Sequence, residues 1–260
     1  MSQNWKQETN CIQAGYAPKN GEPRMIPIVQ STTFKYDSSA RMGALFDLEE
    51  SGYFYTRLAN PTNDAVAAKI AALEGGTAAI LTSSGQAANF FAAKMVFGES
   101  IANPALIVLD IERFAKAAHA HGVPLIIDNT FPTPINCQPI KWGADIVTHS
   151  TTKYMDGHDA TVGGVIVDSG KFDWMAHADK FPGLTTPDES YHGITYAEKF
   201  GQAGAFITKC TAQLMRDLGS IPSPMNSYIL NLGLESLHVR MPRHCENALK
   251  AAQFLANHEK

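Results

Sequence analysis

Apolar and polar residues follow one another along this chain in a pattern that predicts helices and short strands in turn. A helix is expected over 64–73, where small and apolar residues recur at helical spacing before a Gly-Gly pair ends it. A short apolar strand follows over 78–81. The polar turn 82–85 then leads into a second helix that begins at Gln86. The pattern thus predicts a helix–strand–helix unit in this part of the chain.

The same alternation continues further along. A helix is predicted over 111–121 and a strand over 123–127, with a glycine between them. Two more apolar strands are expected over 145–148 and 163–167. Strands that alternate with helices indicate an α/β fold, with a mostly parallel sheet flanked by helices on both faces.

The remaining regions suggest a division of the chain into three parts. Residues 1–62 are rich in proline, glycine and polar side chains and are interpreted as an extended N-terminal arm. Residues 63–235 form the large α/β domain, and 236–260 are expected to begin a C-terminal domain that is otherwise missing. Near 93–95 a helix changes into a strand without glycine, proline or a polar turn, although such connections ordinarily take several residues. We therefore predict that a segment is missing there.

Composition narrows the class of protein. The chain has 260 residues, of which 45% are hydrophobic and 18% charged, as in a globular protein with a large interior. A net charge of −4 without any basic run disfavours nucleic-acid binding, and no apolar run is long enough for a membrane span. The start lacks the apolar stretch of a secretory signal, and the four cysteines are scattered, so a cytoplasmic protein with free thiols is expected. His119 and His121 are expected at a helix end, and no metal site is predicted.

The residues best suited to chemistry follow two neighbouring strands. The segment 149–154 (His-Ser-Thr-Thr-Lys-Tyr) places Lys153 among hydroxyls, and Asp128 ends an earlier strand. A pyridoxal phosphate enzyme needs this combination, because a lysine amine forms the Schiff base and a carboxylate keeps the pyridine nitrogen protonated. The lysine must also be neutral, which burial would favour. Alone, Lys153 is more typical of an exposed loop and Asp128 of a turn, but together they predict pyridoxal phosphate.

Two further segments could hold the phosphate group. The turn 83–86 joins a strand to a helix, where free backbone N–H groups and the helix dipole attract anions. At carboxyl ends of strands in such a sheet, Ser84, Asp128 and Ser150 are expected to lie close together. In the arm, Tyr55 and Arg57 could donate hydrogen bonds to a phosphate. The alternatives are an ordinary helix cap for the turn and a surface arginine for the arm.

Longer stretches resemble one enzyme family. They cover residues 21–24, 30–33, 55–62, 83–87, 101–104, 126–130, 150–158 and 181–193. These stretches are similar to the Cys/Met-metabolism family of pyridoxal phosphate-dependent enzymes, and 181–193 resembles its sulfhydrylase branch. The resemblance extends over nearly all of the chain.

The resemblance implies a fold-type I architecture and roles for individual residues. Lys153 would carry the Schiff base, and Asp128 would pair with the pyridine nitrogen. The other cofactor-binding residues implied are Gly85, Gln86, Ser150 and Thr152 at the phosphate, Asn103 near the ring, and Tyr55 and Arg57 reaching the phosphate of a neighbouring subunit. A homotetramer with shared active sites is implied as well, and 63–235 would be the cofactor-binding large domain.

The family also implies a reaction. Sulfide or methanethiol would displace acetate from O-acetyl-L-homoserine at the γ carbon, giving homocysteine or methionine. Two alternatives stay open: a cystathionine or methionine γ-lyase or γ-synthase of the same family, and a catalytically dead chain that serves as an oligomer partner. Two family residues are not found here. The ring-stacking tyrosine is expected in the segment missing near 93–95, and the substrate-carboxylate arginine beyond Lys260.

Overall fold

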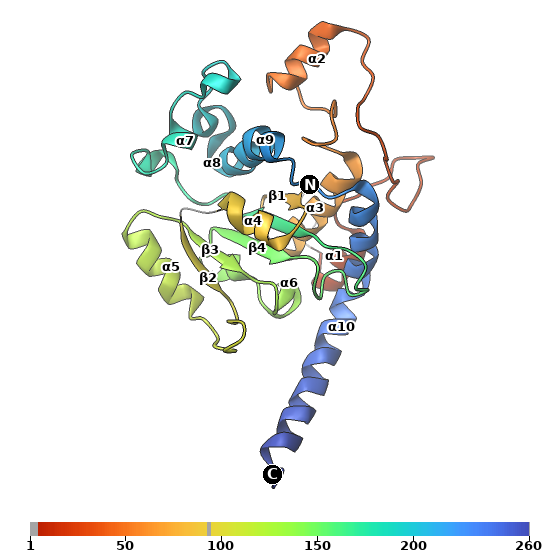
Figure 1. Cartoon of the computed structure of the whole chain (residues 1–260), viewed down its shortest axis with the longest axis vertical. Helices are drawn as coiled ribbons and strands as arrows, with labels where there is room; N and C mark the ends of the chain where they lie inside the picture. The colour runs from red at the N-terminus through yellow and green to blue at the C-terminus, as the bar shows by residue number, and fades with distance from the viewer. Residues whose placement is uncertain (1–4, 93–94, 260) are drawn as a thin grey trace.

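The computed structural model describes residues 5–92 and 95–259, and within them a five-stranded sheet lies at the centre of the molecule (Figure 1). The strands are β1 (Ala78–Thr82), β2 (Val96–Glu99), β3 (Leu125–Asp128), β4 (Ile146–Ser150) and β5 (Gly164–Asp168). They lie in the order β1-β5-β4-β3-β2, so β2 forms one edge of the sheet. The pairs β2·β3 and β3·β4 are parallel, whereas β5 is antiparallel to both β1 and β4. Because β5 alone is reversed, the mostly parallel α/β fold is confirmed.

The helices vary widely in length. The α-helices are α1 (Gln7–Gln13), α2 (Ser39–Phe46), α3 (Pro61–Glu74), α4 (Gly85–Ala92), α5 (Ile111–Ala120), α6 (Thr133–Asn136), α7 (Pro182–Thr185), α8 (Tyr196–Lys209), α9 (Arg216–Leu218) and α10 (Pro224–Ala256). Three short 3₁₀ turns cover Pro139–Trp142, Met175–His177 and Glu189–Tyr191, and a π-helical turn, Cys210–Met215, joins α8 to α9.

Helices cover both faces of the sheet, which follows from the alternation of side chains along each strand. Ile126, Ile146 and Ile166 face α4 and α8 in one apolar cluster. Val147 and Val165 point to the other face, where α3 and α10 supply the packing residues. The strands are therefore buried on both sides, and their polar ends are the places where a ligand can reach them.

Local signals explain where α3 begins and ends. The side chain of Asn60 accepts a hydrogen bond of 3.0 Å from the backbone N–H of Thr62, and Pro61 occupies the first helical position. Gly75 ends the helix in the left-handed region, with φ of 77°. The predicted helix over 64–73 is confirmed and extends further at both ends.

The N-terminal region contains structure that the sequence pattern does not reveal. Helix α1 packs against α3 and α10, and its Cys11 is fully buried. With seven residues, α1 is too short to show a clear apolar period. At least this part of the expected arm therefore packs against helices from later in the chain.

Helix α10 runs without interruption across the boundary expected at 236. Its first half buries Leu230, Leu234 and Leu237, whereas from Pro242 onward the side chains are exposed and the helix extends away from the body (Figure 1). No helix in the described ranges is both long enough and apolar enough to span a membrane. Of the junction predicted at 93–95, residues 93–94 lie outside the described residues.

Candidate active site

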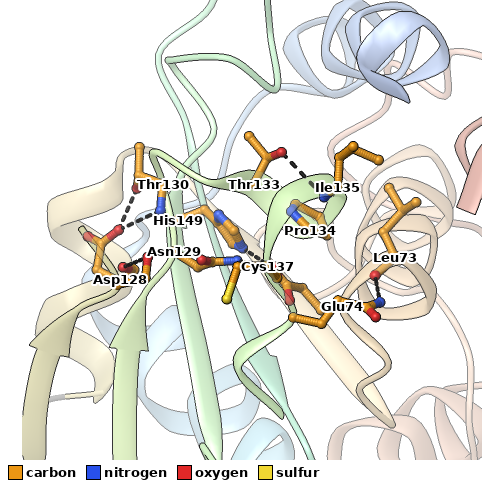
Figure 2. A network of polar contacts seen from close by, with 12 residues as sticks. Leu73, Glu74, Asp128, Asn129, Thr130, Thr133, Pro134, Ile135, Cys137 and His149 are labelled. Carbon is orange, nitrogen blue, oxygen red and sulfur yellow. Dashed lines mark hydrogen bonds and ion pairs between the residues drawn. The ribbon is translucent and has the colours of Figure 1, made fainter. Parts of the chain in front are cut away.

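A single hydroxyl joins the carboxyl ends of β3 and β4. Asp128 is the last residue of β3 and Ser150 the last residue of β4. The Thr130 hydroxyl donates to Asp128 Oδ1 at 2.5 Å and accepts the Ser150 N–H at 2.8 Å. The Thr130 N–H also donates to Asp128 Oδ1, at 3.0 Å (Figure 2). Oδ1 thus accepts two hydrogen bonds from Thr130, whereas Oδ2 accepts only one long hydrogen bond, of 3.4 Å from Asn89, and can accept another from a ligand.

A second residue that sequence reasoning missed orients the same carboxylate. Asn89 of α4 accepts a hydrogen bond of 2.7 Å from the Thr148 hydroxyl, and its Nδ2 lies 3.4 Å from Asp128 Oδ2. Thr148 is the register partner of Asp128 across β3 and β4. Asn89 lies four residues after Gly85, one helical turn along the same face of α4, and this spacing is the signal that could have found it.

Gly85 brings the start of α4 against the end of β4. A Cβ built on Gly85 would lie 2.7 Å from Ser150 Cβ and 2.8 Å from Ser150 Cα, closer than real Cβ atoms come to their neighbours. The helix is capped by Ser84, whose hydroxyl accepts the Ala87 N–H at 3.1 Å. The first N–H groups of a helix have no acceptor within it, so Gly85 and Gln86 present a cradle for an anion beside Ser150.

Thr152 holds the turn that follows β4. Its hydroxyl accepts the Gly163 N–H at 3.1 Å and lies 3.2 Å from the Gly163 carbonyl, to which it donates. The turn is thereby fixed to the start of β5, whose reversed direction brings Gly163 to this edge of the sheet. The Thr152 hydroxyl has one hydrogen, so it could donate to a phosphate only by giving up its hydrogen bond to the Gly163 carbonyl.

Lys153 lies in this turn, close to the residues already described. Its side chain is exposed, and among the described residues its ammonium has no hydrogen bond or ion pair. Lys153 is therefore an exposed lysine in this chain, and its role as the Schiff-base residue remains a prediction. Its neighbours in this segment, Thr151 and Met155, are buried, so the exposed part of the turn is Lys153 itself.

The arrangement fits a phosphorylated pyridine. Asp128 Oδ2 can accept a hydrogen bond from a protonated ring nitrogen, and the Gly85 cradle with Ser150 can bind a phosphate at the same ends of the strands. The description of the family that matches, Cys/Met metabolism PLP-dependent enzyme, agrees with these two subsites, and the match covers residues 8–93 and 91–260. The chain belongs to this family.

Relatives within the Cys/Met metabolism family support the assignment. A homocysteine/cysteine synthase from Kluyveromyces lactis is 41% identical over 90% of this chain and 65% of its own length. An O-acetyl-L-homoserine sulfhydrylase from Leptospira meyeri is 36% identical over all of this chain and 72% of its own length. Against the K. lactis and Saccharomyces cerevisiae homocysteine/cysteine synthases, this chain spans only 65% and 64% of the relative's length.

Solved structures of similar proteins show the same fold. A Campylobacter jejuni protein named as an O-acetylhomoserine (thiol)-lyase matches with a TM-score of 0.92 and 29% identity, over 98% of this chain and 77% of that one. That structure contains N'-pyridoxyl-lysine-5'-monophosphate. A cystathionine γ-lyase from Lactobacillus plantarum matches with a TM-score of 0.74 and 26% identity, over 98% of this chain and 70% of that one.

Three residues that the family resemblance pointed to form no hydrogen bond with Gly85, Asp128 or Ser150 in the described part of the chain. Asn103 is exposed, and its backbone N–H donates to the Glu99 carboxylate at 2.9 Å. The guanidinium of Arg57 lies 5.1 Å from the centre of the Tyr55 ring and is exposed. In the described part of the chain, neither Tyr55 nor Arg57 forms a hydrogen bond with Gly85 or Ser150. The roles of Asn103, Tyr55 and Arg57 remain predictions.

Proposed function

We propose that this chain is a pyridoxal phosphate-dependent enzyme that replaces the acetate of O-acetyl-L-homoserine with sulfide or methanethiol. The products would be homocysteine or methionine. The proposal rests mainly on one observation. The Asp128 carboxylate and the Gly85 anion cradle lie together at the carboxyl ends of the strands, because Thr130 bonds to both Asp128 and Ser150 and Gly85 lies against Ser150. The names of the relatives, homocysteine synthases and O-acetylhomoserine sulfhydrylases, support the choice of substrate.

Each residue of the site has a defined task in this proposal. The N–H groups of Gly85 and Gln86 and the Ser150 hydroxyl would bind the phosphate, with Thr152 holding the turn beside them. Asp128 Oδ2 would keep the proton on the pyridine nitrogen, because Thr130 already occupies Oδ1. When bound, pyridoxal phosphate supplies an electron sink for the negative charge that develops on the substrate.

Lys153 has two tasks in the proposal. Its amine is the group to which the cofactor would be attached, and Nζ would later move a proton between the α and β carbons of the substrate. An exposed ammonium is solvated by water, so a bound cofactor and substrate must displace that water before Nζ can act as a base.

A neighbouring subunit would complete the site. Tyr55 and Arg57 pack on one another, and the Arg57 guanidinium is exposed, so it can reach outside its own chain. An arginine fork and a phenol are suited to phosphate oxygens. We therefore propose a homo-oligomer, of the tetrameric kind that the family resemblance implies, in which each phosphate is shared between two chains.

We further propose that the chain lacks a segment near 93–95. Two observations support this. The family match is broken into two parts that meet at 91–93. The alignment with the L. meyeri relative occupies 322 positions, more than the 260 residues of this chain, so that relative carries residues inside the aligned region that have no counterpart here.

The proposed function is tested by cofactor attachment and product analysis. The purified protein would be loaded with pyridoxal phosphate, reduced with borohydride and digested, and the pyridoxyl group should map by mass spectrometry to Lys153. With O-acetyl-L-homoserine and sulfide, the expected product is homocysteine. A Lys153→Ala variant is the control and should give neither result. Formation of a 2-oxo acid and ammonia without thiol would instead identify a γ-lyase.

One structural observation favours a second candidate, a catalytically inactive oligomer partner. The Lys153 side chain is exposed, and none of the described residues forms a hydrogen bond or ion pair with its Nζ. In this case the purified protein would associate with other copies or with a longer family member but would contain no pyridoxyl group after reduction. Cofactor content measured on the isolated oligomer separates the two candidates.

A further inference from the structure

A buried polar cluster lies directly beneath the candidate site. It consists of Glu74, His149 and Asn129, whose side chains are shielded from solvent (Figure 2). Glu74 Oε1 lies 2.5 Å from His149 Nε2 and accepts a second hydrogen bond of 3.0 Å from Asn129 Nδ2. Asn129 Nδ2 also donates to the Cys137 carbonyl at 2.9 Å. We call these three residues the Glu–His–Asn cluster.

Two members of the cluster are chain neighbours of site residues. Asn129 follows Asp128, and His149 precedes Ser150. Successive side chains of a strand point to opposite faces, so the cluster lies on the face opposite the site. Figure 2 shows the side chains of Asp128 and Asn129 directed to opposite sides. The cluster therefore connects the ends of β3 and β4 on one face of the sheet, and Thr130 connects them on the face that carries the site.

The third member links both strand ends to a helix. Glu74 is the last residue of α3, where a carboxylate is disfavoured by the helix dipole. It is also fully buried, which is costly for a charged group unless it is well paired. Apolar residues of similar volume would fill this space without these costs. What the polar cluster adds is directional: Glu74 Oε1 fixes the positions of Asn129 and His149 relative to each other.

We propose that Glu74, His149 and Asn129 are positioning residues for the cofactor. By fixing the ends of β3 and β4, they set the separation between the Asp128 carboxylate and the Ser150 phosphate subsite. A rigid cofactor must meet both groups at once, so an error in their separation reduces its affinity. This inference rests on the proposed function, because it concerns the same site.

The test compares cofactor affinity with stability in variants of the apo protein. Asn129→Ala removes the link from Glu74 to β3 and leaves the Glu74–His149 contact intact. Pyridoxal phosphate would be titrated into each protein and followed by its visible absorbance, and unfolding would be followed separately by circular dichroism. We expect the dissociation constant to rise about tenfold or more, as when outer supporting contacts of a bound centre are removed. The share of Lys153 trapped by borohydride at a fixed cofactor concentration should fall in parallel.

A matched control lies at the opposite ends of the same strands. Asp145 is buried just before β4, and its Oδ2 accepts the Leu125 N–H at 2.8 Å, at the start of β3. Asp145→Ala should lower the thermal unfolding midpoint as Asn129→Ala does, because each removes hydrogen bonds that hold the ends of β3 and β4. It should leave the dissociation constant within about twofold of the parent, because a loss of stability alone does not change the site of the folded molecules.

The outcomes separate the inference from the proposed function. If the parent binds pyridoxal phosphate and Asn129→Ala binds it equally tightly with the same absorbance, the inference is overturned and the proposed function stands. If the parent binds no cofactor, the proposed function fails and the inference fails with it. Should Asn129→Ala not fold, Asn129→Leu replaces it, since leucine has a similar volume but removes both hydrogen bonds that Asn129 Nδ2 donates. Weaker cofactor binding by that variant supports the inference, and unchanged binding overturns it.

Discussion

The substitution Gly85→Ala tests whether the close approach of α4 to β4 is necessary for the site. The new methyl carbon would lie 2.7 Å from Ser150 Cβ and 2.8 Å from Ser150 Cα. Ordinary carbon contacts are about 3.5–4.0 Å, so the helix must move by roughly 1 Å. Two of the three closest atoms belong to the Ser150 backbone, and they cannot rotate away. We expect a cost of about 1–3 kcal/mol in the free energy of unfolding, typical of overpacking.

The same displacement should affect the cofactor more than the fold. A shift of about 1 Å at a ligand site can reduce function on the order of 100-fold. Urea unfolding of the apo protein and titration with pyridoxal phosphate measure the two effects. Gly43→Ala is a suitable control, because Gly43 lies in α2 with no atom within 4 Å of a new methyl group. It should be neutral or stabilising by about 0.5–1 kcal/mol. Parent-like stability and affinity in Gly85→Ala would refute the reasoning.

Three further predictions concern other named groups. Burial raises the pKa of Asp168 to about 7, so this carboxyl contributes stability at low pH that is lost as the pH rises from about 4 to 7. Asp168→Asn should remove that loss, so its free energy of unfolding at pH 8, measured by chemical denaturation, should exceed that of the parent by up to about 4 kcal/mol. If the variant shows the same dependence of stability on pH as the parent, this prediction is contradicted. Burial alone would raise the pKa of Asp188, but hydrogen bonds led by Lys209 outweigh it and lower the pKa to about 2. The contribution of the Asp188 carboxylate to the free energy of unfolding should therefore be lost as the pH falls from about 4 to 2. In Asp188→Asn, the free energy of unfolding should depend less on pH over this range. Thr130→Val removes the hydroxyl that holds Asp128, so its dissociation constant for pyridoxal phosphate should rise about tenfold while Thr→Val at an exposed site leaves it unchanged.

Local sequence signals were sufficient for the elements that build the site. The helix α3, the strand β3 and the start of α4 lie within a few residues of their predicted positions, because caps, glycines and apolar runs act over short distances. The convergence of Asp128 and Ser150 followed from the parallel direction of β3 and β4. The reversal of β5 did not follow, since strand direction depends on the tertiary arrangement and not on an apolar run.

Supporting contacts were harder to predict than the residues they support. Asn89 bonds to Thr148, 59 residues away in the sequence, and Thr130 bonds to Ser150, 20 residues away. The four-residue spacing from Gly85 could have placed Asn89 near the site, but no spacing rule connects it to Thr148, or Thr130 to Ser150, before the fold is known. The sequence left the exposure of Lys153 open, because the burial of a loop side chain depends on which other segments cover it. The division of the chain at 62 and 235 remains an interpretation.

The position of β2 at the edge of the sheet has a consequence for how the protein behaves at high concentration. An edge strand presents a row of backbone donors and acceptors that can pair with any extended chain. Phe97 of β2 is 46% exposed, so this row is accompanied by apolar surface. Among the described residues β2 pairs with β3 alone. The sheet that holds the candidate site therefore also has an edge to which another strand can pair. The tendency of the protein to aggregate at high concentration should depend on whether β2 is covered.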